Sequence, residues 1–136
     1  MTFDFKISIY GTNFNVEKFI NLTALSLTNV DKKDTPINDR KMYNNSGCDI
    51  QIIKENQNID SIGSYIQRFI LDNKNVFQNL KENLFADRIT LIGHFYFDTE
   101  EELALTFGFS SDFHATLAQF DIDTDFTIWD NSEFEK

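Results

Sequence analysis

One stretch near the C-terminal end constrains the fold of this chain more than any other, because apolar and polar residues alternate along it almost without a break. Residues 120–128 read Phe-Asp-Ile-Asp-Thr-Asp-Phe-Thr-Ile, with apolar side chains at most even positions and Asp at the first three odd ones. Successive side chains of a β-strand point to opposite faces of a sheet, so the pattern predicts a half-buried strand. We expect Asp121, Asp123 and Asp125 to form a row on its solvent-facing side.

Comparable patterns predict the other elements. Alternation predicts four more strands, over residues 5–10, 49–54, 88–97 and 103–109. Helical spacing predicts a helix over residues 16–25, two helices separated at residues 72–75, and a short helix after Ser110. The turn between the predicted strands at residues 88–97 and 103–109 favours an antiparallel hairpin. Residues 28–48 show neither the two-residue repeat of a strand nor the spacing of a helix, so they are predicted to form one long loop.

The predicted element order is β-α-β-α-β-β-α-β. It indicates an α+β fold in which residues 1–136 form a single domain, with an antiparallel or mixed sheet of about five strands and helices packed on it. The hydrophobic fraction is 41%, with 15 Phe, which is enough for one buried core. The residues expected in that core are Phe19, Ile66, Phe69, Ile70, Leu91, Phe95, Phe107, Leu117 and Ile122.

The start of the first helix has its own signature. Asn15 is the predicted N-cap, because its side-chain oxygen can accept a hydrogen bond from the first turn. Phe14 and Phe19 occupy the two positions of a hydrophobic staple on either side of this cap. We expect Phe19 and Ile20 to be buried.

Charge is distributed unevenly along the chain. Residues 1–86 hold 10 acidic and 10 basic side chains, whereas residues 87–136 hold 12 acidic side chains and only Arg88 and Lys136, so the net charge of −10 lies entirely in the last third. A negative surface repels phosphate, which argues against direct binding of nucleic acid. It attracts cationic partners, although an acidic surface also serves solubility alone.

Composition also indicates where the protein acts. No apolar run approaches the roughly 20 residues of a membrane helix, which argues against a membrane partner. The first six residues, Met-Thr-Phe-Asp-Phe-Lys, do not have the pattern of a secretory signal. A single cysteine, Cys48, is typical of a reducing compartment. We therefore expect a cytoplasmic protein.

The aspartate row allows two explanations. A calcium-binding EF-hand loop needs Gly at its sixth position and Glu at its twelfth, but Phe126 and Ser132 stand there. The row is then either ordinary solvation and edge protection, or a surface for Lys and Arg of a partner. Trp129 shares the odd parity of the aspartates, and an exposed Trp beside carboxylates is typical of a binding hot spot. The candidate partner-binding residues are Asp121, Asp123, Asp125, Trp129, Glu100, Glu101 and Glu102.

Signals of catalysis are weak. Cys48, His94 and His114 are the only thiol and imidazoles, and their spacing matches neither a nucleophilic pair nor a zinc site. The sequence has no glycine-rich phosphate loop and no nucleophile-elbow motif. We therefore expect no enzymatic activity, no cofactor and no metal.

Two segments resemble a known family. Ile-Ser-Ile-Tyr-Gly-Thr-Asn-Phe-Asn-Val-Glu-Lys-Phe at residues 7–19 and Leu-Ala-Gln-Phe-Asp-Ile-Asp-Thr-Asp at residues 117–125 are similar to the bacterial family catalogued as domain of unknown function 4279. The resemblance implies an opening strand and helix, a mid-chain helix before a hairpin, and a short helix before a closing strand. It implies no catalytic residues, and relatives of the family include proteins proposed as immunity partners of bacterial toxins.

Three functional hypotheses remain. The first is a non-enzymatic cytoplasmic immunity protein that neutralises a cognate bacterial toxin, such as a nuclease with a basic surface, through its acidic surface. The second is a phage-encoded inhibitor of a defence nuclease that mimics nucleic acid with carboxylates. The third is a small hydrolase or metal enzyme built around Cys48 or the histidines.

Overall fold

The computed structural model describes residues 2–38, 41–53, 59–97 and 108–130. Their helices and strands follow in the order β1 (Thr2–Gly11), α1 (Val16–Leu22), β2 (Leu27–Asp31), β3 (Ser46–Ile53), α2 (Ile59–Asp72), α3 (Lys74–Glu82), β4 (Arg88–Phe97), α4 (Ser111–Gln119) and β5 (Ile122–Asp130). The predicted α+β class is confirmed, because the described residues form a mixed five-stranded sheet with four helices.

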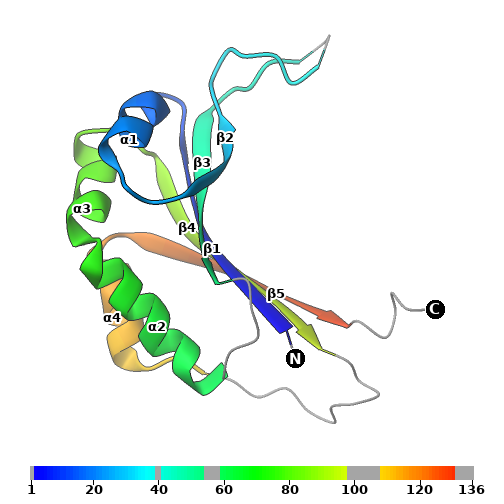
Figure 1. Ribbon diagram of the computed structural model, residues 1–136, viewed down its shortest axis with the longest axis vertical. Coiled ribbons are helices and arrows are strands. Elements are labelled where there is room, and N and C mark those ends of the chain that lie inside the picture. Colours follow the sequence, from blue (N-terminus) through cyan, green and yellow to red (C-terminus); the bar gives the residue numbers. More distant parts are fainter. Residues whose placement is uncertain (1, 39–40, 54–58, 98–107, 131–136) are drawn as a thin grey trace.

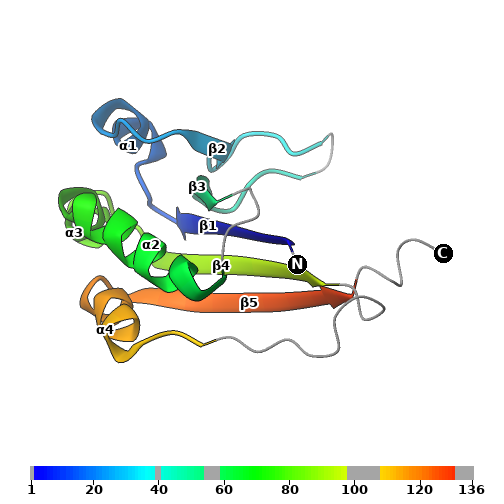
Figure 2. The same ribbon diagram turned by 60° about the horizontal axis from the view of Figure 1, so that its bottom comes forward.

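The five strands form one sheet in the order β2-β3-β1-β4-β5 (Figures 1 and 2). Neighbouring strands are antiparallel except for β4 and β5, which run parallel with Ile89 paired to Ile122. A parallel pair needs a crossover connection, and α4 lies in the connection between β4 and β5. The prediction that the alternating segment forms a strand of this sheet is confirmed by β5.

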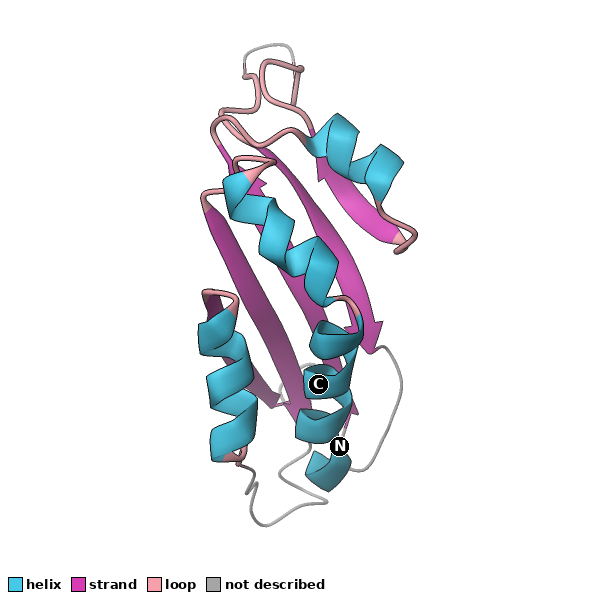
Figure 3. Ribbon diagram, turned by 90° about the vertical axis from the view of Figure 1, so that its left-hand side faces the viewer, coloured by secondary structure: helices cyan, strands magenta, loops and turns pink. Residues whose placement is uncertain are grey.

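The four helices of the described residues all lie on the same side of the sheet (Figure 3). Each helix contributes apolar side chains to the core, and the fully or nearly fully buried ones are Val16, Phe19, Ile62, Ile66, Ile70, Phe77, Leu80, Phe113 and Leu117. We call the side of the sheet beneath the helices the covered face. None of the described helices combines the length and the apolar character that crossing a membrane requires.

The covered face holds the core, as the alternation predicts. Seven of the nine expected core residues are buried; Phe69 is only half-buried, and Phe107 lies outside the described residues. Packing is close at Gly93, where a Cβ atom would meet Phe5 Cε1 at 2.6 Å and Phe126 Cδ1 at 2.8 Å. Gly93 therefore makes room for the rings that cover β4.

The predicted hairpin between residues 88–97 and 103–109 is wrong. β4 pairs along one edge with β1 and along the other edge with β5, so neither edge accepts a hairpin partner. Residues 103–107 lie outside the described residues, and Gly108 and Phe109 are not in a strand. Alternation marks a strand, but it does not show which strands lie beside it, and both partners of β4 are distant in sequence.

The predicted long loop, residues 28–48, contains more structure than expected. β2 covers its first residues, β3 begins at Ser46, and Pro36 and Met42 form an isolated bridge between them. β2 has no apolar alternation because its central residues are exposed, and its pairing with β3 shifts register where Asn29 has a φ of 49°. The observed order is therefore β-α-β-β-α-α-β-α-β.

The local signals at the helix ends are largely confirmed. Asn15 Oδ1 accepts a hydrogen bond from Lys18 N at 3.1 Å, and the Phe14 and Phe19 ring centroids lie 5.9 Å apart, as a staple requires. The break at residues 72–75 is also confirmed, because α2 ends at Asp72 and α3 begins at Lys74. The expected burial of Ile20 is wrong, since this side chain is 38% exposed.

Candidate functional site

The side of the sheet that faces away from the helices is the candidate site, and we call it the open face. It consists of the even-numbered residues of β1 and β4, the odd-numbered residues of β3 up to Gln51 and of β5, and Thr28 and Asp31 of β2, as the strand register shows. Among the described residues, no helix lies on this side (Figure 3). The polar and apolar residues that alternate along the strands thus lie on two faces of the sheet with different environments.

Three of the predicted site residues lie together on the open face. Asp123, Asp125 and Trp129 are exposed and pair with Thr90, Ile92 and Tyr96 of β4. The prediction that Trp129 lies on the same face of the strand as these two aspartates is therefore confirmed. Their carboxylates and indole occupy one edge of the described sheet, next to the even-numbered side chains of β4.

Asp121 does not belong to this row. It precedes β5 with a φ of 54°, and its N–H donates to Ala118 O at 3.1 Å, so it ends α4 in the left-handed conformation. The prediction of three aspartates along one strand face is therefore wrong for Asp121. Aspartate tolerates this conformation better than most residues, which is why the alternating pattern could begin before the strand does.

The carboxylates are also better compensated than the local sequence indicates. Lys81 of α3 forms an ion pair with Asp121, and Arg88 Nε lies 3.0 Å from Asp123 Oδ2. Hydrogen bonding to the Tyr10 hydroxyl, and then to Asp123, raises the pKa of Arg88. Both bases are more than 30 residues away in sequence, so only the fold brings them to these carboxylates.

A second charged group lies on the other half of the open face. Lys6 Nζ is 3.2 Å from Asp49 Oδ2, and Asn29 Nδ2 donates to the same oxygen at 2.9 Å. Asp49 is 8% exposed, so its charge is shielded from water but neutralised by Lys6. On the strands as a whole, the open-face carboxylates outnumber the bases Lys6 and Arg88; they are Asp4, Asp31, Asp49, Asp123 and Asp125.

An aromatic group occupies the end of the open face nearest the ends of β4 and β5. Trp129 Nε1 donates a hydrogen bond to His94 Nδ1 at 3.0 Å. The ring planes of Tyr96 and Trp129 lie 26° and 29° from that of His94, each with centroids 6.3 Å away. In neutral His94 this bond places the remaining ring proton on Nε2. Trp129 is 38% exposed although it is held in place by its neighbour.

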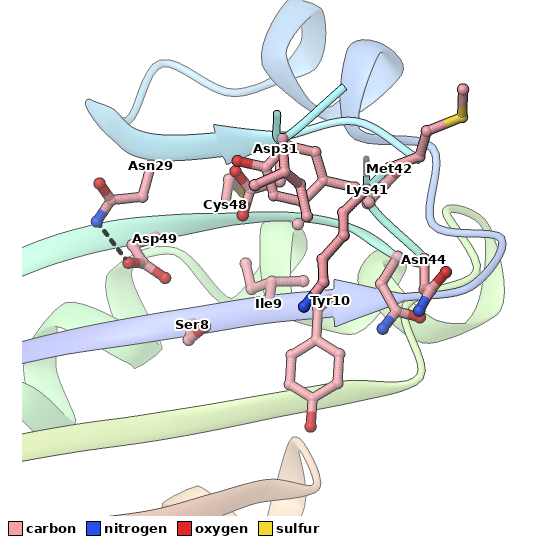
Figure 4. A pocket seen from close by; sticks show the side chains of 15 residues that line it. Ser8, Ile9, Tyr10, Asn29, Asp31, Lys41, Met42, Asn44, Cys48 and Asp49 are labelled. Carbon is pink, nitrogen blue, oxygen red and sulfur yellow. Dashed lines mark hydrogen bonds between the residues drawn. The ribbon is translucent and has the colours of Figure 1, made fainter. Parts of the chain in front are cut away.

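A hollow of about 830 Å³ adjoins the other end of the open face, between β1, β2, β3 and residues 41–45 (Figure 4). Most of the residues that line it have polar side chains, and some of these already form hydrogen bonds with each other, such as Asn29 with Asp49. Asp31 raises the pKa of the Tyr43 phenol through its charge and a hydrogen bond. The Lys41 side chain extends across the hollow toward β1 (Figure 4).

The thiol and imidazoles are not brought together. Cys48 is buried on the covered face of β3, while His94 lies on the open face of β4, with β1 between these strands. His114 is on α4, where its ring contacts Phe109 and Phe113. Burial, and then the charge of Asp49, raises the pKa of the Cys48 thiol to about 12, so it stays protonated near neutral pH. No cluster of three or more potential metal ligands occurs among the described residues.

The sequence did not identify every residue of this face. Glu100, Glu101 and Glu102 lie outside the described residues. Conversely, His94 and Tyr96 of β4 lie beside Trp129 on this face, although the sequence pattern indicated His94 only as a weak candidate for catalysis. Their even numbers place these two residues on the opposite face of β4 from its buried, odd-numbered residues. Only the pairing of β4 with β5 brings them to Trp129.

No protein-family model, no curated protein and no solved structure matched the chain. The resemblance to domain of unknown function 4279 therefore stays a prediction.

Proposed function

We propose that the protein is a non-enzymatic binding protein of the cytoplasm whose open face binds a protein partner with a basic surface, in the manner of an immunity protein that neutralises a toxin. One observation carries the proposal: all four helices cover one side of the sheet, while the other side presents carboxylates and an exposed Trp129. A sheet face of this kind combines steering charges with an anchor for binding.

The sign of the charge supports a basic partner. The two bases on the strands of the open face, Lys6 and Arg88, each lie within ion-pair distance of an aspartate. The remaining carboxylates leave a negative surface, and the chain as a whole carries −10. Such a surface repels phosphate and accelerates association with Lys-rich and Arg-rich surfaces, which toxic nucleases need in order to hold nucleic acid.

The experiment measures binding kinetics against the product of the neighbouring gene at two salt concentrations. The double variant Asp123→Asn with Asp125→Asn removes steering charge, so we expect slower association that depends less on salt. Trp129→Ala removes an anchor, so we expect faster dissociation, by about thirtyfold for a hot spot of about 2 kcal/mol.

A matched control carries the same change of charge on the other side of the molecule. Asp72→Asn with Asp112→Asn alters two exposed residues of α2 and α4, away from the open face. Equal kinetics for this variant and the open-face double variant would contradict the proposal. A phage-encoded inhibitor of a defence nuclease would use the same surface, and the identity of the neighbouring gene separates that hypothesis from the first.

A further inference from the structure

The aromatic group of Tyr96, His94 and Trp129 forms a platform with a fixed geometry. The Trp129 Nε1 to His94 Nδ1 hydrogen bond of 3.0 Å lies between the edges of the two rings, which holds the indole and imidazole nearly coplanar at 29°. Tyr96, two residues further along β4 and paired with Trp129 in the strand register, has its ring plane 26° from that of His94. Trp129 is 38% exposed, so part of this residue is accessible to a ligand from solvent.

Charge lies directly beside the platform. Asp4 of β1 pairs with His94 in the strand register, so the two side chains are neighbours on the open face. Gln51 Nε2 donates to Asp4 Oδ1 and also to Phe5 O, at 3.1 Å for the second bond, so Asp4 is held in position. A flat π surface with an adjacent carboxylate attracts a cation through the ring quadrupole and through Coulomb interaction together.

We propose that this platform is the receptor for one arginine side chain of the basic partner, with the guanidinium stacked on Trp129 and His94 and directed toward Asp4. The proposal rests on the proposed function and adds to it the residue type that the partner inserts. A guanidinium is planar, weakly hydrated and stacks on aromatic faces, whereas the ammonium of lysine is a compact, strongly hydrated point charge. The flatness of the platform therefore favours arginine over lysine.

His94 has a positioning role in this arrangement. Its Nδ1 accepts a hydrogen bond from the indole N–H and so fixes the plane of Trp129 before any ligand arrives. A preoriented side chain loses less conformational entropy on binding, which raises affinity without a new contact. His94→Phe keeps the ring but removes the acceptor, so it separates orientation from aromatic area.

The test uses the fact that Trp129 is the only tryptophan of the chain. Its fluorescence and its indole N–H resonance therefore report on the platform alone. The full-length protein is titrated with acetyl-Gly-Arg-Gly-amide, with the lysine analogue, and with a citrulline analogue that has the shape of arginine without its charge. We expect saturable changes with half-saturation about fivefold lower for the arginine peptide than for the citrulline peptide, and lysine between them.

Two isosteric variants localise the response. Asp4→Asn is expected to weaken binding of the arginine peptide about threefold, whereas Asp112→Asn, which makes the same charge change at an exposed residue of α4, leaves it unchanged. His94→Phe is expected to weaken it and to shift the indole N–H resonance of the free protein. Equal losses in Asp4→Asn and Asp112→Asn would overturn the proposal, because they would indicate attraction by net charge only.

Other outcomes are equally decisive. Equal responses to arginine and citrulline peptides, or a stronger response to a short oligothymidylate, would replace the arginine receptor by a platform for neutral planar groups or nucleobases. Failure of this inference is distinguishable from failure of the proposed function. If the protein partner still binds and the Asp123, Asp125 double variant still slows its association, the open face is the binding face and only the arginine assignment is wrong.

Discussion

The two faces of β1 show how one strand serves two purposes. Phe3, Phe5, Ile7 and Ile9 point into the covered face and are at most 1% exposed. Their immediate neighbours in sequence, Asp4, Lys6, Ser8 and Tyr10, lie on the open face and are half-buried. The backbone is common to both sets, so the difference comes only from what each face meets: helices on one side, and no described helix on the other. Substitutions on the covered face should therefore act on stability, and those on the open face on binding.

The largest expected effect is on the covered face. Phe5 is fully buried and its ring makes edge contacts with Phe3, Phe95 and Phe126. Phe5→Ala should lower the free energy of unfolding by about 3–5 kcal/mol, measured by urea denaturation, because it leaves a cavity among these rings. Phe85→Ala is the matched control, since Phe85 is 60% exposed, and it should cost far less. Similar decreases in the free energy of unfolding in both variants would contradict the difference between aromatic residues of the covered face and exposed ones.

A smaller effect is expected from adding one methyl group to the same face. Gly93→Ala places a Cβ atom within 2.8 Å of ring atoms of both Phe5 and Phe126, so the rings must move. Overpacking of this kind should lower the free energy of unfolding by about 1–3 kcal/mol, measured by thermal and urea denaturation. Gly108→Ala meets nothing within 4 Å and should be close to neutral. A neutral Gly93→Ala would mean that the covered face is packed less tightly than its distances indicate.

A pH-dependent effect distinguishes the faces at Cys48. Its pKa is raised from 9.0 to about 12 in the folded protein, chiefly by burial and then by Asp49. The stabilising contribution is therefore complete below about pH 9 and is lost as the pH rises toward 12, by about 1.4 kcal/mol per pH unit, because only the unfolded chain releases the proton in this range.

The measurement compares the wild type with Cys48→Ala in urea at about pH 8 and about pH 10. The variant lacks the titrating thiol, so subtracting its pH dependence from that of the wild type cancels other groups. We expect the stability of the wild type relative to the variant to fall by about 1.4 kcal/mol between the two pH values. A difference independent of pH would show that the thiol is as accessible to water as an open-face side chain.

The smallest effect on stability is expected on the open face itself. Asp123 and Asp125 are exposed, and lie two residues apart on one strand face. Changing both to Asn relieves repulsion but removes the ion pair with Arg88, so the free energy of unfolding should change by less than about 0.5 kcal/mol. Denaturation of this variant tests the difference between the two faces, because a variant that loses binding but keeps its stability shows that Asp123 and Asp125 serve binding. A loss above about 2 kcal/mol would instead give them a structural role.

The sequence could predict much of the fold but less of the candidate site. Residues whose role depends on local period were placed correctly, among them the buried Ile66 and Leu91 and the exposed Asp123 and Trp129. The hairpin prediction failed because it used closeness in the chain to choose a partner for β4. β2 was missed because an edge strand with exposed central residues and a register shift has no apolar period to detect.

The sequence by itself determined which side chains share a face, because the two-residue repeat of an extended chain is a local property. It also determined where α1 begins, through Asn15, and where α2 ends, through the polar residues at 72–75. Only the tertiary structure decided that β5 lies parallel to β4, that Lys81 meets Asp121, and that His94 orients Trp129. These contacts join residues 33 to 40 positions apart, and their formation depends on the packing of the whole sheet against its helices rather than on any pattern within one segment.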